Sequence, residues 1–194
     1  MAYDINLEGK NKLEAHQLLK DTSKVLDSCN IDYWLDGGTL LGIHRENRLL
    51  PWDDDVDLSI MYTGEESMNK LLKSLKKSKL RIRPKTFQQT CEHFVKDKVR
   101  VIKIRNNKLL GISKGKVCLE IFIRYPHGKD TYCGIGPIKQ VIPIKLCDSF
   151  KKINFEGDDF NAPKLTNEYL THKYGDWKTP VKEWSVFSDD KANI

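Results

Sequence analysis

Residues 35–57 read Leu-Asp-Gly-Gly-Thr-Leu-Leu-Gly-Ile-His-Arg-Glu-Asn-Arg-Leu-Leu-Pro-Trp-Asp-Asp-Asp-Val-Asp, and this stretch decides the fold. The apolar and aromatic run at 31–35 predicts a short strand that leads into Gly37-Gly38. Residues 39–47 are compatible with a helix, and a proline shortly after them ends it. A strand, a glycine-rich turn and a helix therefore come directly before a cluster of acids.

Acidic residues alternate with apolar ones at the end of this stretch, and the alternation continues to Ile60. Because a strand has a two-residue period, Asp53, Asp55 and Asp57 are expected on one face. Burying like charges without a counter-charge costs several kcal/mol, and a bound cation removes that cost. We predict that these three carboxylates bind Mg²⁺ or Mn²⁺, which prefer oxygen ligands. The alternative is an exposed acidic turn.

Gly37, Gly38 and Thr39 lie at the expected start of the helix. Backbone N–H groups at such a position form an anion pocket, so we predict that these residues bind a substrate phosphate that faces the metal. The alternative is an ordinary tight turn in which Thr39 caps the helix.

Glu120 is the single acid within the apolar segment 117–123. A buried carboxylate has to be paired, protonated or bound to a metal. We predict that Glu120 is a third metal ligand or a base that takes the proton of a substrate hydroxyl group. An ion pair with a lysine or arginine is the alternative.

Three cations are candidates for contacts with a substrate diphosphate. Arg45 follows the glycine-rich turn, and Lys103 and Arg105 share one face of a predicted strand. Each of them has solvated surface charge as its alternative.

The remaining pattern predicts one α/β (α+β) domain over residues 1–194, with a mixed central sheet flanked by helices. The tail at 185–194 is polar and is expected to fray. The other expected elements are helices at 10–29 and 65–78, strands at 80–83, 93–95, 99–104 and 117–123, a loop with short strands at 125–150, a hairpin of 151–155 with 159–161, and a helix between Pro163 and Gly175.

Composition excludes several classes of protein. The chain has 194 residues, 39% hydrophobic and 31% charged, which is typical of a folded soluble domain. The sequence shows no membrane span and no signal peptide, so we expect a cytoplasmic protein. Five widely spaced cysteines argue against a disulfide framework, and the Cys91-x-His93 spacing is weak for zinc. The net charge of +6 favours an anionic ligand, but no nucleic-acid motif accompanies it.

The stretches 35–42 and 50–57 resemble the signature of the LicD/fukutin family. Weaker similarity extends to Lys103-Ile104-Arg105, to Phe155-Glu156-Gly157 with Pro163, and to Tyr174-Gly175-Asp176-Trp177. The resemblance therefore covers about residues 10–180. It departs from the family at Glu120, where an aspartate is usual, and at Arg48, where a glycine is frequent.

This resemblance implies a nucleotidyltransferase-type fold and a phosphotransferase reaction. Family members move a phosphoalcohol, such as phosphocholine or ribitol phosphate, from a CDP-linked donor to a glycan or glycolipid hydroxyl. Asp55 and Asp57 would then hold the metal together with a third acid. Two other possibilities stay open: a true nucleotidyltransferase that moves a nucleoside monophosphate from an NTP, and a binding module without activity.

A choline donor would favour an aromatic box for its quaternary ammonium group. Trp34, Trp52 and Tyr62 lie near the motif in the sequence, but we expect them to pack in the core rather than to form such a box.

Overall fold

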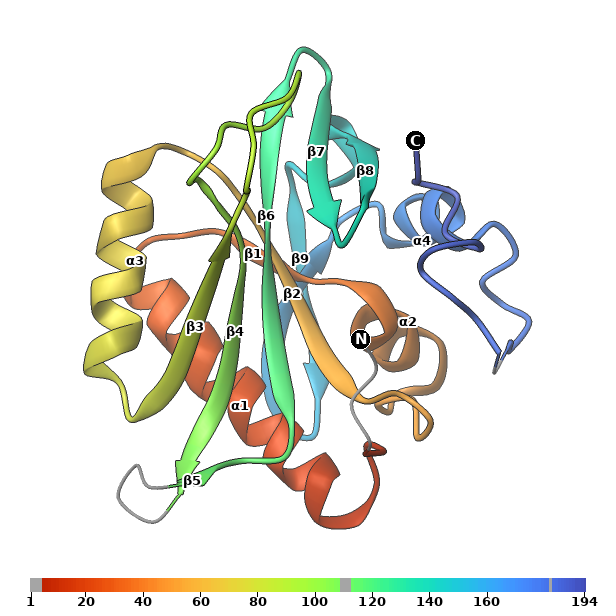
Figure 1. Ribbon diagram of the computed structural model, residues 1–194. Helices are drawn as coiled ribbons and strands as arrows, with labels where there is room; N and C mark the ends of the chain where they lie inside the picture. The colour runs from red at the N-terminus through yellow and green to blue at the C-terminus, as the bar shows by residue number, and fades with distance from the viewer. Residues whose placement is uncertain (1–4, 109–112, 182) are drawn as a thin grey trace.

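The computed structural model describes residues 5–108, 113–181 and 183–194. A mixed sheet runs through its centre in the order β1-β2-β6-β4-β3 (Figure 1). Its strands are β1 (Tyr33–Leu35), β2 (Asp55–Met61), β6 (Cys118–His127), β4 (Val99–Lys108) and β3 (Leu80–Thr86). Strands β2 and β6 are parallel, and the other neighbours on this path are antiparallel. The predicted mixed sheet is confirmed.

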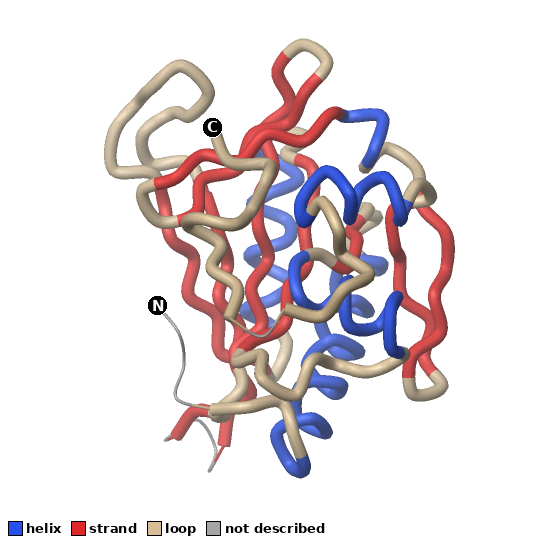
Figure 2. The backbone as a smooth tube through the Cα atoms, turned by 90° about the vertical axis from the view of Figure 1, so that its right-hand side faces the viewer, coloured by secondary structure: helices blue, strands red, loops and turns tan. Residues whose placement is uncertain are grey.

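Two helices, α1 (Gly9–Ser28) and α3 (Glu65–Lys77), lie side by side against one face of this sheet (Figures 1 and 2). Helix α1 buries Ala15, Leu18, Leu19 and Leu26, which recur at helical spacing and form one apolar stripe. None of the described helices is long and apolar enough to cross a membrane.

Helix α2 (Gly37–Glu46) begins where β1 ends, so the glycine pair forms its first turn. It ends at Asn47, whose left-handed backbone (φ 50°) closes the last turn. Helix α4 (Thr166–Tyr174) ends at Gly175, as the sequence predicted. It begins later than Pro163, because that proline completes a strand.

Smaller strands complete the fold. Strand β5 (Ser113–Lys114) pairs with β4, and a short 3-10 turn spans Ile144–Leu146. Strands β9 (Phe150–Phe155) and β10 (Asp158–Pro163) form the predicted hairpin. The segment expected as a loop with short strands contains two, β7 (Asp130–Ile135) and β8 (Ile138–Pro143), which form a regular hairpin, and β7 pairs with the end of β6.

The predicted strand at 93–95 is wrong. Only an isolated bridge joins Cys91 to Phe94, and the segment is otherwise turn. The side chain of Phe94 instead packs by stacking its ring on that of Phe87, with the ring centroids 4.2 Å apart.

The segment 185–194 is packed in the structure, where its polar composition predicted fraying. Ala192 is fully buried and Asp190 is 4% exposed. The backbone N–H of Val141 donates to the carbonyl of Ala192, and that of Lys191 donates to the carbonyl of Lys173. This segment is therefore attached to both β8 and α4.

Candidate active site

The sheet places an acid, a second acid and a cation in one row. Asp57 on β2 is the register partner of Glu120 on β6, and Glu120 is the partner of Lys103 on β4. Lys103 Nζ lies 2.5 Å from Glu120 Oε1. The ion pair that was the alternative for Glu120 is therefore present, and a role for Glu120 as ligand or base stays a prediction.

The acids of β2 and of the loop before it are half-buried, and together they carry an excess of negative charge. Burial, followed by repulsion from neighbouring carboxylates, raises the pKa values of Asp55 and Asp57 well above the usual range. Burial also raises the pKa of Asp53 to about 6. Asp57 Oδ1 is buried and has no hydrogen-bond partner among the described residues. Lys103 lowers the pKa of Asp55, but burial and the neighbouring carboxylates outweigh it.

A divalent cation fits this donor set. Carboxylate oxygens of Asp53, Asp54 and Asp55 lie within 4.8 Å of one another. The orphaned oxygen of Asp57 belongs to the same acidic cluster, because Asp55 and Asp53 contribute to its raised pKa. Oxygen ligands are those that Mg²⁺ and Mn²⁺ prefer. Asp54 was not singled out from the sequence, because strand alternation assigned it to the opposite face.

The two glycines of α2 make room for these carboxylates. A methyl group on Gly37 would overlap Oδ2 of Asp57, and one on Gly38 would overlap Oδ2 of Asp53. Gly37 also has a left-handed backbone, with φ of 55°. In this structure, therefore, the groups nearest to the glycines are the protein's own carboxylates.

Thr39 is engaged inside the protein. Its side-chain oxygen accepts a hydrogen bond of 2.9 Å from the backbone N–H of Asp57, and the residue is 1% exposed. The backbone N–H of Asp36 donates to the carbonyl of Asp57. The start of α2 is thus bonded to both backbone groups of Asp57, and a direct phosphate contact by the Thr39 side chain finds no support here.

We expect Gly38→Ala to destabilise the protein and to weaken metal binding. Helix propensity alone favours alanine by about 0.5–1 kcal/mol, so a loss of stability would come from the overlap with Asp53. Thermal unfolding of Gly38→Ala, Asp53→Ala and the double variant separates the two effects. The overlap is disproved if Gly38→Ala costs as much with Asp53→Ala as without it.

Arg45 and Arg105 are occupied by contacts within the chain. Arg45 donates to Glu46 and to the carbonyl of Trp177, although it lines the cavity described next. Arg105 donates to the carbonyls of Gly115 and Lys116 and is not among the lining residues. Arg105 lies further along β4 than Lys103, next to the segment around β5. The predicted contact of Arg105 with a diphosphate is therefore not supported.

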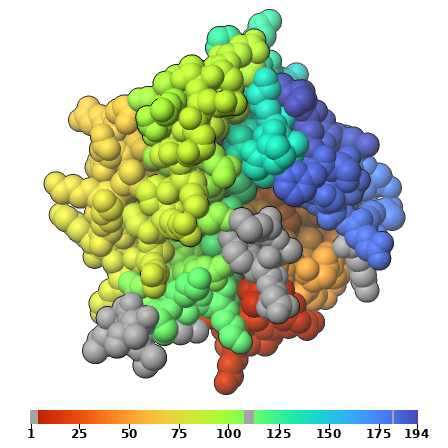
Figure 3. Space-filling view, in the orientation of Figure 1, coloured from red at the N-terminus to blue at the C-terminus, as the bar shows by residue number. Residues whose placement is uncertain are grey.

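A cavity of about 710 Å³ opens over the acids. Acids from β2 and β6 line it together with apolar residues of the C-terminal segment, a name used here for the described residues that follow α4. These apolar residues are Trp177, Trp184, Val186 and Phe187. Figure 3 shows this face of the molecule, with β3 and β4 in yellow-green and the C-terminal segment in blue. Pockets of this size hold small-molecule ligands.

The three aromatic residues near the motif do not form an aromatic box. Trp52 lines the cavity, but Trp34 is fully buried and stacks on Phe150, and Tyr62 stacks on Tyr125. The expected core packing is confirmed for Trp34, and Tyr62 is partly buried against the core.

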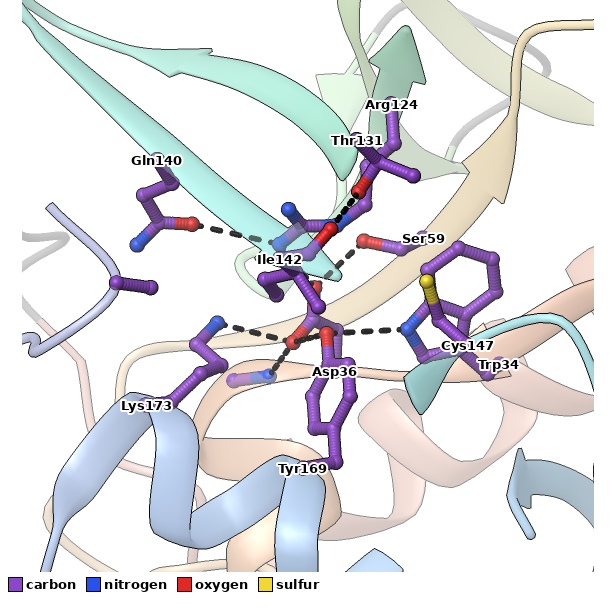
Figure 4. A network of polar contacts seen from close by, with 12 residues as sticks. Trp34, Asp36, Ser59, Arg124, Thr131, Gln140, Ile142, Cys147, Tyr169 and Lys173 are labelled. Carbon is purple, nitrogen blue, oxygen red and sulfur yellow. Dashed lines mark hydrogen bonds and ion pairs between the residues drawn. The ribbon is translucent and has the colours of Figure 1, made fainter. Parts of the chain in front are cut away.

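Asp36, directly before the glycines, is the centre of a buried polar network (Figure 4). Its Oδ1 accepts hydrogen bonds from Lys173 at 2.9 Å, from Tyr169 at 2.8 Å and from the backbone of Gly37 at 2.7 Å. Its Oδ2 accepts from Ser59 at 2.6 Å and from Arg124 at 3.2 Å. The network therefore ties the first turn of α2 to β2, β6 and α4.

The network keeps Asp36 ionised. Burial by itself raises the pKa of this carboxyl, but Lys173 and Arg124 outweigh burial and hold the pKa well below its usual range. Asp190 extends the network, since Gln140 donates to it and Lys173 Nζ lies 3.9 Å away. No sequence pattern marked Lys173, Arg124 or Asp190, because their roles depend on contacts between distant segments.

The family model described as "LicD/FKTN/FKRP, nucleotidyltransferase domain" matches residues 30–165. The chain belongs to this LicD/FKTN/FKRP family. The matched region contains the acids, the glycine pair, Glu120 and Lys103, whereas α4 and the C-terminal segment lie outside it.

Members of the LicD/FKTN/FKRP family with curated names are similar along much of the chain. Human "Ribitol-5-phosphate transferase FKTN" is 27% identical over 176 residues, which are 88% of this chain and 34% of the human protein. An uncharacterized protein of Rickettsia typhi is 38% identical over 126 residues, 65% of this chain and 33% of that protein. The chain thus spans about a third of the length of these relatives.

A solved structure, that of ANT(2")-Ia in complex with adenylyl-2"-tobramycin, is similar with a TM-score of 0.46. Its sequence identity is 14%, and the match covers 88% of this chain and 81% of that one.

Proposed function

We propose that this protein is a metal-dependent phosphotransferase that moves a phosphoalcohol, such as ribitol phosphate or phosphocholine, from a CDP-linked donor to a glycan hydroxyl. The observation that carries the proposal is the half-buried acidic cluster that lines a cavity, in which the buried Oδ1 of Asp57 has no hydrogen-bond partner among the described residues. Family membership and the names of the FKTN relatives support the reaction class.

The ligands proposed for one or two divalent cations, Mg²⁺ or Mn²⁺, are Asp55 and Asp57, with Asp53 and Asp54 beside them. Such a cation supplies positive charge to the phosphate oxygens of the donor. The protein positions these ligands. Gly37 and Gly38 let the carboxylates approach α2, and the network around Asp36 holds the first turn of that helix in place. Most of the catalysis in this type of reaction comes from positioning and electrostatics.

Glu120 is the residue we assign to the acceptor's proton. It is 7% exposed, lines the cavity and is held by Lys103. The acceptor oxygen forms a bond to the phosphorus that carries the alcohol, the bond from that phosphorus to the CMP oxygen breaks, and CMP leaves with the electron pair. The hydroxyl proton passes to Glu120.

The donor is identified by thermal unfolding with CDP-ribitol, CDP-choline, CDP, CTP or ATP, each with and without Mg²⁺ or Mn²⁺. A ligand that binds only the folded state raises its stability by mass action, about 2.7 kcal/mol at a hundred times its Kd. We expect metal-dependent stabilisation by a CDP-alcohol that exceeds that by CDP and CTP.

A preference for CTP or ATP would instead favour transfer of a nucleoside monophosphate, and the two reactions differ in which half of the donor ends on the acceptor. No metal-dependent response to any of these nucleotides would contradict both.

A further inference from the structure

Two cations that line the cavity are not used by the reaction as described so far. They are Lys85 on β3 and Arg100 on β4. Neither forms an ion pair with any residue in the part of the chain that the structure describes. The other three lining cations are paired: Lys103 with Glu120, Arg45 with Glu46 and Lys173 with Asp36.

A β-bulge directs Arg100 into the cavity. Lys85 pairs with Val101 and Thr86 pairs with Val99, so Arg100 is an extra residue between two register positions. Regular alternation would place Arg100 on the face opposite to Lys103. A bulge re-aims a side chain at such a point and is frequent next to active sites.

Lys85 and Arg100 are both partly buried. Lys85 lies on the same face as its partner Val101, which is 2% exposed, and both residues line the cavity. Arg100 donates through NH1 to the carbonyl of Gly134 on β7 at 3.4 Å, a contact that leaves its charge uncompensated. The cavity therefore has carboxylates on β2 and two uncompensated cations on β3 and β4.

We propose that Lys85 and Arg100 form a phosphate-binding subsite at this side of the cavity. This inference rests on the proposed function, which supplies a phosphate-bearing substrate. In the subsite, the guanidinium group of Arg100 and the ammonium group of Lys85 would bind the oxygens of a phosphate. The phosphate comes either from the donor's diphosphate or from a phosphate group on the acceptor.

The test compares Arg100→Gln and Lys85→Met, which keep the side-chain stems, with the control Arg83→Ala. Arg83 is exposed, lies two residues from Lys85 on the same strand, and does not line the cavity. Calorimetry with Mg²⁺ measures the affinities for pyrophosphate, CDP-ribitol and glycerol 3-phosphate. Thermal unfolding verifies that each variant is folded, and Arg100→Lys should recover part of any loss.

We expect each variant to bind at least one of these ligands about tenfold more weakly than wild type, while Arg83→Ala changes little. A loss for CDP-ribitol and pyrophosphate identifies the donor as the source, and a loss confined to glycerol 3-phosphate identifies the acceptor. Affinities equal to those of Arg83→Ala, or no binding of any phosphate by wild type, overturn the subsite. If wild type transfers nothing from CDP-alcohols but the variants still lose pyrophosphate binding, the subsite stands and the proposed function fails.

Discussion

Asp57→Asn is expected to abolish transfer and, at the same time, to raise the stability of the metal-free protein. The carboxylate lies among like charges, and its buried Oδ1 has no hydrogen-bond partner in the described structure. Removing the charge removes a repulsion, which we expect to stabilise the metal-free fold by on the order of 2 kcal/mol. The loss of a ligand should lower the rate by more than the roughly 10–100-fold that loss of an outer partner costs.

The gain in stability should grow with pH. A carboxyl group whose pKa is raised by folding favours the folded state only while it is protonated, so its contribution is lost as pH rises from the unfolded value towards the folded one. The difference in melting temperature between Asp57→Asn and wild type without metal should therefore increase between about pH 4 and about pH 7. Asp32→Asn, an equal change at an exposed site, is the control. Normal turnover by Asp57→Asn, or a less stable metal-free protein, would refute the assignment.

Asp36→Asn is expected to cost about 3–5 kcal/mol of unfolding free energy, the usual effect of breaking a buried ion pair. The change leaves Arg124 and Lys173 buried without the carboxylate that compensates them; their side chains are 1% and 5% exposed. Because the pKa of Asp36 is lowered by folding, its stabilisation is present above its unfolded value and is lost only in strong acid. The effect should therefore appear across the neutral range.

Urea unfolding at neutral pH measures this loss. Asp158→Asn is the matched control, because Asp158 pairs with Lys20 near the surface, where such a pair contributes about 0–1 kcal/mol. If the two variants lost equal stability, the network around Asp36 would not be the stabilising centre that its contacts indicate.

The periodicity of apolar residues was sufficient to predict most of the helices and the strands of the central sheet. The alternation of Val56, Leu58 and Ile60 with acids placed Asp55 and Asp57 on one face, and this is how β2 is built. The pattern also identified Glu120 as an acid within an apolar strand. It could not show that Glu120 would be the register partner of Asp57, because strand pairing depends on the whole topology.

The positions that the sequence missed depend on departures from regular geometry or on distant contacts. In a regular strand Arg100 would lie on the face of β4 that points away from the cavity. The bulge opposite Lys85 and Thr86 changes its direction and brings it to the cavity. Lys173 is one of many lysines, and nothing local distinguishes it from solvated surface charge. The C-terminal segment is polar in composition, yet Asp190 is buried because it interacts with other buried polar groups.

The dependence of Asp36 on Lys173 has a consequence for how the protein forms on the ribosome. Synthesis proceeds from the N-terminus at about 5–20 residues per second, so Asp36 emerges well before Arg124 and long before Lys173. Until α4 has been made, burying Asp36 would leave the carboxylate without one of its two cations. We expect the first turn of α2 to remain solvated in the nascent chain and to close only after translation has passed α4, which makes the assembly of the acidic cluster a late event in biogenesis.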